Sequence, residues 1–564
     1  IMNRNTEMHF SQVPSIGLSR SKFDRSFDHK TTFNCGSLIP VYIDTTIMPG
    51  DTVKMRMSEV VRMLTPIAPV MDNAYLDTYF FFVPKRLIWD HFKRFMGEND
   101  TAPWTQTTEY TEPQITAPVN GWSKGTLADY FGYPTKVGGW KASALPFRAY
   151  CMIWNEWFRD ENLKNPVYIT TGDSDTTGKD YNALNYDPVT DTECGSKPLK
   201  VAKLHDYFSS ALPGSQKGPS VSVPLGTTAP IIGSKPNNIY TGYHNATDFE
   251  NTPISAYNDG NGIFNIGTDA TSPEYGLGNL GQTTLVADLS AAVGATVNQL
   301  RQAFAIQKFY ERQARSGSRY IEVVKGHFDV TNPDFRVQRP EYLGGKRIPI
   351  NMNQVIQTDS SGKTSYWDPN EGDSGEWKTN DKTPQGNAAA YSITSDSNED
   401  LFTKSFTEHG ILMGLICVRT DHSYQQGLNR QFSMKKFTDY YWPEFANLGE
   451  MAILNKEIYM SGTETDDEAA FGYQEAWANY RYFPNIITGE MRSNYAQSLD
   501  IWHYGDDYSQ LPNLGSDWID EPEENMARTL AIQNHDQLFG DFYFGAIYTR
   551  PMPLYSVPGL IDHH

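Results

Sequence analysis

The stretch that most constrains the fold runs from residue 72 to residue 97 and reads DNAYLDTYFFFVPKRLIWDHFKRFMG. Alternate side chains of a strand point to opposite faces, and here both sets become apolar towards Phe82. Pro84 cannot donate a backbone hydrogen bond to a neighbouring strand, and the apolar residues after it recur at helical spacing. We therefore predict a strand that is buried on both faces, ends at Pro84 and is followed by a helix.

Four other segments predict further strands. The run 411–418, ILMGLICV, is apolar throughout, which is typical of a central strand covered on both faces, and a final strand begins at Asp541. The alternating residues 37–57 predict a β-hairpin, because the Pro49-Gly50 pair fits a type II turn. Residues 320–324 also have the composition of a strand.

Further helices are predicted in three other places. One begins near Pro146, where apolar residues follow at spacings of three and four. A second covers about 297–314, between a capping box of Thr296 with Gln299 and a closing Gly317. A third begins near Pro522.

The composition favours a mainly β, loop-rich protein. The 564 residues include 33 prolines and 44 glycines, which favour turns, and 33 Tyr, 29 Phe and 12 Trp, which favour strands. Residues 98–140 are rich in turn residues and are predicted to form an ordered surface loop. Two polar segments, about 170–290 and 357–400, are predicted to be insertions.

The charge is unevenly distributed. A net charge of -20 at pH 7 means that the chain as a whole would be repelled by nucleic acid, so any such contact must be local. Residues 1–36 form a locally positive arm with interleaved phenylalanines, and such a segment could face DNA or could simply anchor an extended arm to its neighbours. The arm residues predicted to face inwards are Arg4, Arg20, Lys22 and Arg25.

A second basic surface lies on the predicted helix 297–314. Arg301, Lys308, Arg312 and Arg315 follow one another at spacings of seven, four and three, so they share one side of a helix. Two uses remain open for this side: ion pairs between subunits, or contacts with phosphates.

Patterns that would indicate catalysis or a cofactor fail on their context. The glycines of Gly276-Leu-Gly278-Asn-Leu-Gly281 match a dinucleotide-binding pattern, but no apolar strand precedes them. The twelve histidines show no zinc-binding spacing, and the four cysteines are too sparse for a disulfide framework. We therefore expect no cofactor, no metal and no catalytic residue. No window of the sequence is long and apolar enough to insert into a membrane.

Several motifs together make the chain resemble the major capsid protein of gokushoviruses, small single-stranded DNA phages of the Microviridae. They are FFFVPKRLIW at 80–89, LPFRAYCMIWNEWFRDENL at 145–163, NQLRQAFAIQKFYERQARSGSRY at 298–320, RPEYLGG at 339–345 and RPMPLYSVPGL at 550–560. The resemblance implies an eight-stranded viral jelly roll with long insertions. It further implies a T=1 icosahedral shell around a circular single-stranded DNA genome, assembled in the host bacterial cytoplasm, with a small basic DNA-binding protein beside the DNA.

The resemblance also implies a division of the chain, with a surface protrusion at the threefold axes that contacts a receptor on the host cell. The expected parts are a basic inner arm (1–36), the first jelly-roll strands (37–169), the protruding insertion (170–290), a helix and strand (291–356), a second surface insertion (357–400) and the remaining strands (401–564).

Within the protrusion, about 212–284, the residues predicted to touch the host are Tyr240, Tyr243, His244, Phe249 and Tyr257. Packing of these aromatic residues against symmetry mates is the alternative. For the whole chain, a carbohydrate-active jelly-roll enzyme or lectin is the alternative function, because exposed aromatic residues and carboxylate pairs also suit sugar binding and cleavage.

Overall fold

A computed structural model describes residues 19–99, 108–182, 184–221, 231–233, 255–258, 264–267, 285–287, 297–356, 364–368, 376–380 and 388–555. The chain divides into two compact units. Unit 1 comprises Ile1–Ser215 and Gln313–His564, and unit 2 comprises Gln216–Arg312.

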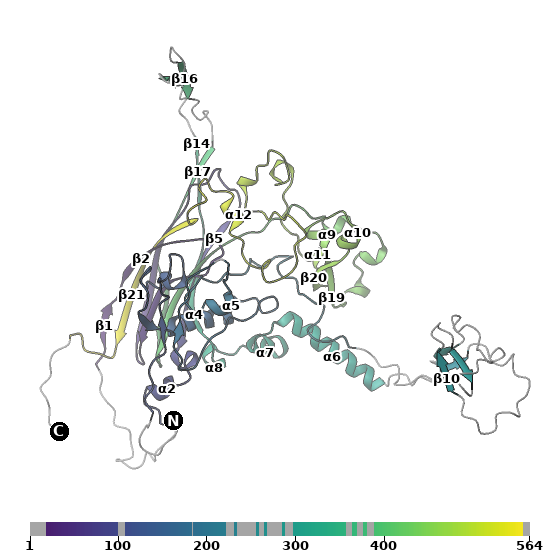
Figure 1. Cartoon of the computed structure of the whole chain (residues 1–564), viewed down its shortest axis with the longest axis horizontal. Coiled ribbons are helices and arrows are strands. Elements are labelled where there is room, and N and C mark those ends of the chain that lie inside the picture. Colours follow the sequence, from purple (N-terminus) through teal and green to yellow (C-terminus); the bar gives the residue numbers. More distant parts are fainter. Residues whose placement is uncertain are drawn as a thin grey trace, which may run out of the picture. The chain divides into compact units, whose positions relative to one another are not determined.

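Unit 1 is built on two antiparallel sheets (Figure 1). The first has the order β1-β21-β4-β17-β14, and β2 also pairs with β21. Its strands are β1 (Ser21–Asp24), β2 (Phe27–Phe33), β4 (Thr52–Met63), β14 (Met352–Ile356), β17 (Ala388–Ser405) and β21 (Leu538–Arg550). The second sheet has the order β13-β5-β18-β3, with β3 (Ile39–Ile47), β5 (Ala74–Pro84), β13 (Glu341–Pro349) and β18 (Gly410–Thr420).

The main core lies between the inner faces of these two sheets. Phe80 of β5, Tyr42 of β3 and Phe544 of β21 are buried there, and the rings of Tyr42 and Phe544 are 5.2 Å apart. Burying an aromatic side chain of this size contributes about 1.5–3 kcal/mol. The alternation of β4, whose every second residue is buried, is typical of a strand with one face on a core.

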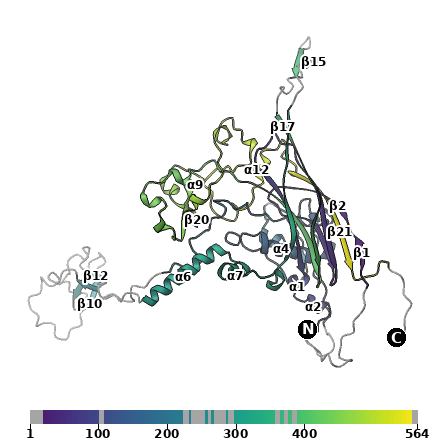
Figure 2. The ribbon, with the colours of Figure 1, turned by 180° about the vertical axis from the view of Figure 1, so that it is seen from behind.

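The outer face of the second sheet carries another core, and this explains the apolar character of β5 and β18 on both faces. Phe81, next to Phe80, points away from the first core and belongs to a second buried cluster with Phe147, Trp89 and Ile411. The helices of this layer include α1 (Lys85–Ile88), α2 (Phe92–Phe95), α3 (Leu127–Tyr130) and α4 (Leu145–Ile153), which continues as a π-helix (Trp154–Phe158). Figure 2 shows α1 and α4 beside the strands from behind. The predictions of two doubly buried strands and of a helix near Pro146 are therefore confirmed.

A third, smaller core joins the loop around Phe208 to the hairpin of β19 (Glu450–Leu454) and β20 (Ala470–Glu475). The remaining α-helices and strands described in unit 1 are β6 (Gln114–Thr116), β7 (Lys141–Ser143), β8 (Thr176–Thr177), α5 (Pro188–Asp191), α7 (Tyr320–Phe328), α8 (Asp334–Val337), β15 (Thr364–Asp368), β16 (Glu376–Asn380), α9 (Asn455–Ile458), α10 (Glu464–Asp467), α11 (Ala478–Arg481) and α12 (Glu524–Ala527).

Unit 2 contains two short antiparallel pairs among its described residues. They are β9 (Ile231–Gly233) with β12 (Leu285–Ala287), and β10 (Ser255–Asn258) with β11 (Phe264–Gly267). Helix α6 (Val297–Ser316) starts in this unit, and its bounds agree with the predicted helix. No helix in the described ranges combines the length and the apolar composition needed to cross a membrane.

Three predictions of local structure are wrong. Residues 37–57 do not form a hairpin, because β3 pairs with β18 whereas β4 pairs with β17 and β21. The turn at Gly50, whose φ is +92°, carries the chain from one sheet to the other. Residues 320–324 are helical: the Glu322 carboxylate accepts the Arg319 backbone N–H at 3.1 Å and caps α7. Residues 108–140 are not simply a surface loop, since Trp122 and Leu127 are fully buried.

Candidate functional surfaces

The described part of the basic arm is anchored to the first sheet. Arg20 donates to Thr52 Oγ1 at 2.8 Å and to two backbone carbonyls, and Arg25 forms an ion pair with the buried Asp44. The Arg25 guanidinium also lies 4.8 Å from the ring centre of Tyr548. Lys22 is exposed, and Arg4 lies outside the described residues. The contacts of Arg20 and Arg25 fit the anchoring alternative, and contact with DNA stays a prediction.

The basic residues on α6 separate into two kinds. Arg301, Lys308 and Arg312 are exposed and form no ion pair with another described residue. Arg315 forms an ion pair with Glu450, whose side chain is only 1 % exposed. The sequence predicted four equivalent basic residues, whereas in the structure Arg315 differs from the other three because it forms an ion pair within the chain.

The five residues predicted to touch the host belong to unit 2. Tyr240, Tyr243, His244 and Phe249 lie outside the described residues, and Tyr257 stands in β10, paired with Asn265 of β11. Their role stays a prediction.

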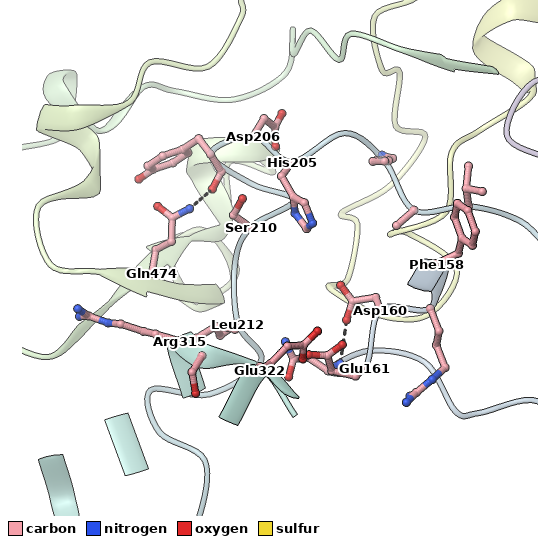
Figure 3. A pocket seen from close by; sticks show the side chains of 18 of the residues that line it. Phe158, Asp160, Glu161, His205, Asp206, Ser210, Leu212, Arg315, Glu322 and Gln474 are labelled. Atoms are coloured by element: carbon pink, nitrogen blue, oxygen red, sulfur yellow. Dashed lines mark hydrogen bonds between the residues drawn. The ribbon is translucent and has the colours of Figure 1, made fainter. Parts of the chain in front are cut away.

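A pocket of about 1350 Å³ in unit 1 was not predicted from the sequence. The end of the π-helix, the loop 201–212, the start of α7 and strand β20 surround it (Figure 3). Tyr79, Phe81 and Phe158 form an aromatic wall, and their rings lie 5.1 to 6.5 Å apart. Its lining comes from separate segments spread between Tyr79 and Asn485, so no local pattern could have revealed it.

Arg319 holds the wall of this pocket together. Its guanidinium donates to Glu161 at 2.6 Å, to Glu322 at 3.0 Å and to the backbone carbonyl of Arg159 at 2.7 Å. Burial, and the nearby carboxylate of Glu161, raise the pKa of Glu322. These contacts of Arg319 fix the start of α7 against the end of the π-helix. Nowhere in the described ranges do three or more His, Cys, Asp or Glu side chains gather as metal ligands would.

A buried cluster of charged side chains includes Lys203 of the loop 201–212. His422 Nδ1 lies 3.1 Å from Asp506 Oδ1, and His422 Nε2 lies 3.1 Å from Glu521 Oε2. Both ring nitrogens thus face carboxylates, which requires the imidazolium form. Lys203 Nζ lies 3.0 Å from the second oxygen of Asp506, and all four side chains are at most 3 % exposed.

The pKa values in this cluster follow from those contacts. Burial alone would lower the pKa of His422, but the charges of Asp506 and Glu521 outweigh it and raise that pKa to about 10. Burial likewise disfavours ionised Asp506, yet Lys203 and His422 hold its pKa well below the usual range. We call the side chains of Lys203, His422, Asp506 and Glu521 the Asp506 cluster.

Large apolar side chains are exposed in the segment 432–486. Phe432 is 72 % exposed and Phe437 is 71 % exposed. The same segment also exposes Tyr440, Tyr441, Trp442, Tyr480, Tyr482, Phe483 and Ile486. These exposed aromatic side chains are candidates for contact with another macromolecule.

Comparison with known proteins identifies the relatives of this chain. The sequence model of a family described as "Capsid protein (F protein)" matches residues 11–560. The protein called Capsid protein VP1 of Bdellovibrio phage phiMH2K is 42% identical, over 99% of this chain and 98% of that protein. Proteins of the same name from Chlamydia phage 1 and Spiroplasma virus 4 are each 38% identical, over 98% and 99% of this chain and 97% and 98% of their own lengths.

Proposed function

Because the chain belongs to this family of phage capsid proteins, we propose that it is the major capsid protein of a small phage and that its copies close into a T=1 icosahedral shell. The shell encloses a circular single-stranded DNA genome. Since the family consists of structural proteins, the alternative of a carbohydrate-active enzyme is not retained.

The observation that supports the proposal is the pairing order of eight strands, which is the order expected for a jelly roll. Numbered in chain order, β2, β3, β4, β5, β13, β17, β18 and β21 are strands one to eight. The first pairs with the last, the second with the seventh, the third with the sixth and the fourth with the fifth. A long hairpin rolled up in this way produces the double-sheet architecture used by viral capsids.

The surface of a single copy supports self-assembly. The exposed aromatic residues of segment 432–486 would be unfavourable in water, and burial against neighbouring copies removes them from it. In a closed symmetric shell, each contact between two copies recurs between all equivalent copies.

Packaging of DNA requires cations that this acidic chain supplies only locally. With a net charge of -20, the shell needs the inner arm and a small basic DNA-binding protein to offset the phosphates. Because Arg20 and Arg25 also bind Thr52 and Asp44, their replacement would weaken the arm as well as remove charge. Lys22, which is exposed, is the cleaner probe of a DNA contact.

Host attachment is assigned to the insertion in unit 2. Replacing residues 222–294 with a short Gly-Ser linker retains Gly218, beside Tyr310, and the whole of α6. Shells of this variant should assemble and package DNA but fail to adsorb to host cells. Normal adsorption by such particles would show that another surface recognises the host.

Size-exclusion chromatography with negative-stain imaging tests the central proposal. We expect closed shells of one size, and nuclease-resistant DNA in particles from infected cells. Small oligomers under all conditions of assembly would contradict the proposal. Alanine at Lys22, combined with alanine at Arg4, should lower the DNA content, whereas unchanged content would leave the arm a structural role only.

A further inference from the structure

We propose that one face of α6 is a docking surface for a second copy of this chain. The α6 face, as we call it, comprises Val297, Leu300, Arg301, Phe304, Lys308 and Arg312. The inference rests on the proposed shell and adds to it a specific interface between copies.

The first observation is that α6 is a long helix with almost no buried side. Of its 20 residues only Ala314 is buried, although a surface helix normally places a broad apolar stripe on its own protein's core. The opposite side of the helix contacts its own unit through Tyr310. The backbone carbonyl of Tyr310 accepts a hydrogen bond from the Lys217 N–H at 3.3 Å, and the Tyr310 ring lies against Gly218.

The second observation is that the exposed side of α6 carries a stripe of apolar side chains. Val297 is 65 % exposed, Phe304 is 66 % exposed and Leu300 is 38 % exposed. These residues are three, four or seven positions apart, so they share one face. Such a stripe is unfavourable in water and indicates that the face is covered in the working particle.

The third observation is the charge on the same face. Arg301, Lys308 and Arg312 lie at spacings of seven and four, and none forms an ion pair with another described residue. The chain as a whole has 67 acidic and 47 basic residues, so a second copy presents the complementary charge.

A second copy fits this face better than DNA does. Phosphates would account for the three cations, and Phe304 could stack on a base, but Val297 and Leu300 have no use in a contact with a nucleic-acid backbone. Arginine beside apolar and aromatic side chains is the composition typical of protein–protein interfaces. Arg315 stands apart, because Glu450 of the same chain already neutralises it.

A cross-linking experiment on intact particles tests the contact directly. The photo-reactive residue p-benzoylphenylalanine is introduced in place of Phe304, and shells are irradiated before denaturing electrophoresis. We expect a covalent dimer. The same residue in place of Tyr310, which lies against Gly218, should react within its own chain and yield no dimer.

The outcomes of this experiment are distinct. A dimer from position 304 but not from position 310 supports the inference. Cross-links from position 304 to packaged DNA would show that the face binds nucleic acid, and irradiated shells without any intermolecular product would show that no copy covers it. Either result overturns the inference but leaves the proposed shell intact, since shells are present in the sample.

Charge reversal tests whether the cations contribute. The variant R301E/K308E/R312E should reduce the yield of empty shells about tenfold or more, because three favourable surface ion pairs become repulsive. The matched control reverses three exposed basic residues elsewhere and changes the net charge equally: Lys93, Lys124 and Arg336. Near-normal shell yield of the control supports a specific role. An equal loss in both variants would assign the effect to net charge, and normal yield of the α6 variant would exclude a contribution from these cations; both results overturn the inference.

Discussion

Two regions of this molecule differ in the burial and pairing of their charged side chains. In the Asp506 cluster, two cations and two carboxylates are at most 3 % exposed, and each faces an opposite charge within the chain. On the α6 face, three cations are exposed and have no such partner among the described residues. The difference suggests that charge which stabilises the subunit is neutralised internally, whereas charge left exposed in a row is available to another molecule.

The largest expected effect is the loss of Asp506. Replacing it with alanine leaves Lys203 and the His422 imidazolium buried without their main counter-ion, together with an unpaired Asn525 amide. Breaking a buried pair in this way costs about 3–5 kcal/mol. Chemical denaturation of the unassembled subunit measures this loss of unfolding free energy. A loss of under about 1 kcal/mol would mean that water reaches the cluster and solvates the unpaired charges.

A smaller effect is expected at Asp77, whose partners are partly in water. Its carboxylate accepts from Arg347 at 2.9 Å and from Arg419 at 3.0 Å, and Arg347 is 46 % exposed. Burial favours the neutral acid, but the two arginines outweigh it and lower the pKa of Asp77. Asp77→Ala should cost about 1.5–3 kcal/mol by the same denaturation assay, because the arginines recover part of their solvation. A cost equal to that of Asp506→Ala would show that exposure does not reduce the effect.

Stability should also depend on pH through His422. The pKa of His422 is raised from 6.5 to about 10, so the native state retains a proton that the unfolded chain loses. The resulting stabilisation is complete below pH 6.5 and is lost as the pH rises towards 10. Denaturation curves of wild type and His422→Gln between pH 6 and 10 measure it. The two proteins should converge at the alkaline end, and a constant difference between them would refute the assignment.

The smallest effect is expected for an ion pair on the surface. Lys30 and Asp541 lie 3.3 Å apart in β2 and β21, and their side chains are 69% and 50% exposed. Asp541→Ala should change the free energy of unfolding by less than about 1 kcal/mol. Thermal melts of the subunit at low and high salt provide the measurement. A larger loss of unfolding free energy that did not depend on salt would mean that this pair behaves like the buried ion pairs.

The family resemblance and several elements were correctly predicted from the sequence. The capsid family is confirmed by the match over residues 11–560. The strands β5 and β18 and the helix α6 were found because their patterns are long and local. Apolar runs and helical spacing record how a segment is buried, and that information lies within the segment itself.

Other features depend on partners that are distant in the sequence, and only the tertiary structure determined them. The hairpin at 37–57 was predicted from a correct turn, but each strand pairs with a segment several hundred residues away. The segment 320–324 has a β-like composition, yet it is helical, because Glu322 caps the first turn of α7 and Arg319 binds Glu161.

The same reason explains which basic residues have partners. The sequence placed Arg301, Lys308, Arg312 and Arg315 on one side of a helix, because helical spacing is a local property. It could not show that Glu450 neutralises Arg315, or that His422, Asp506 and Glu521 meet in the interior. Such contacts form between distant segments that come together when the cores are buried. The local spacing of residues therefore does not predict them.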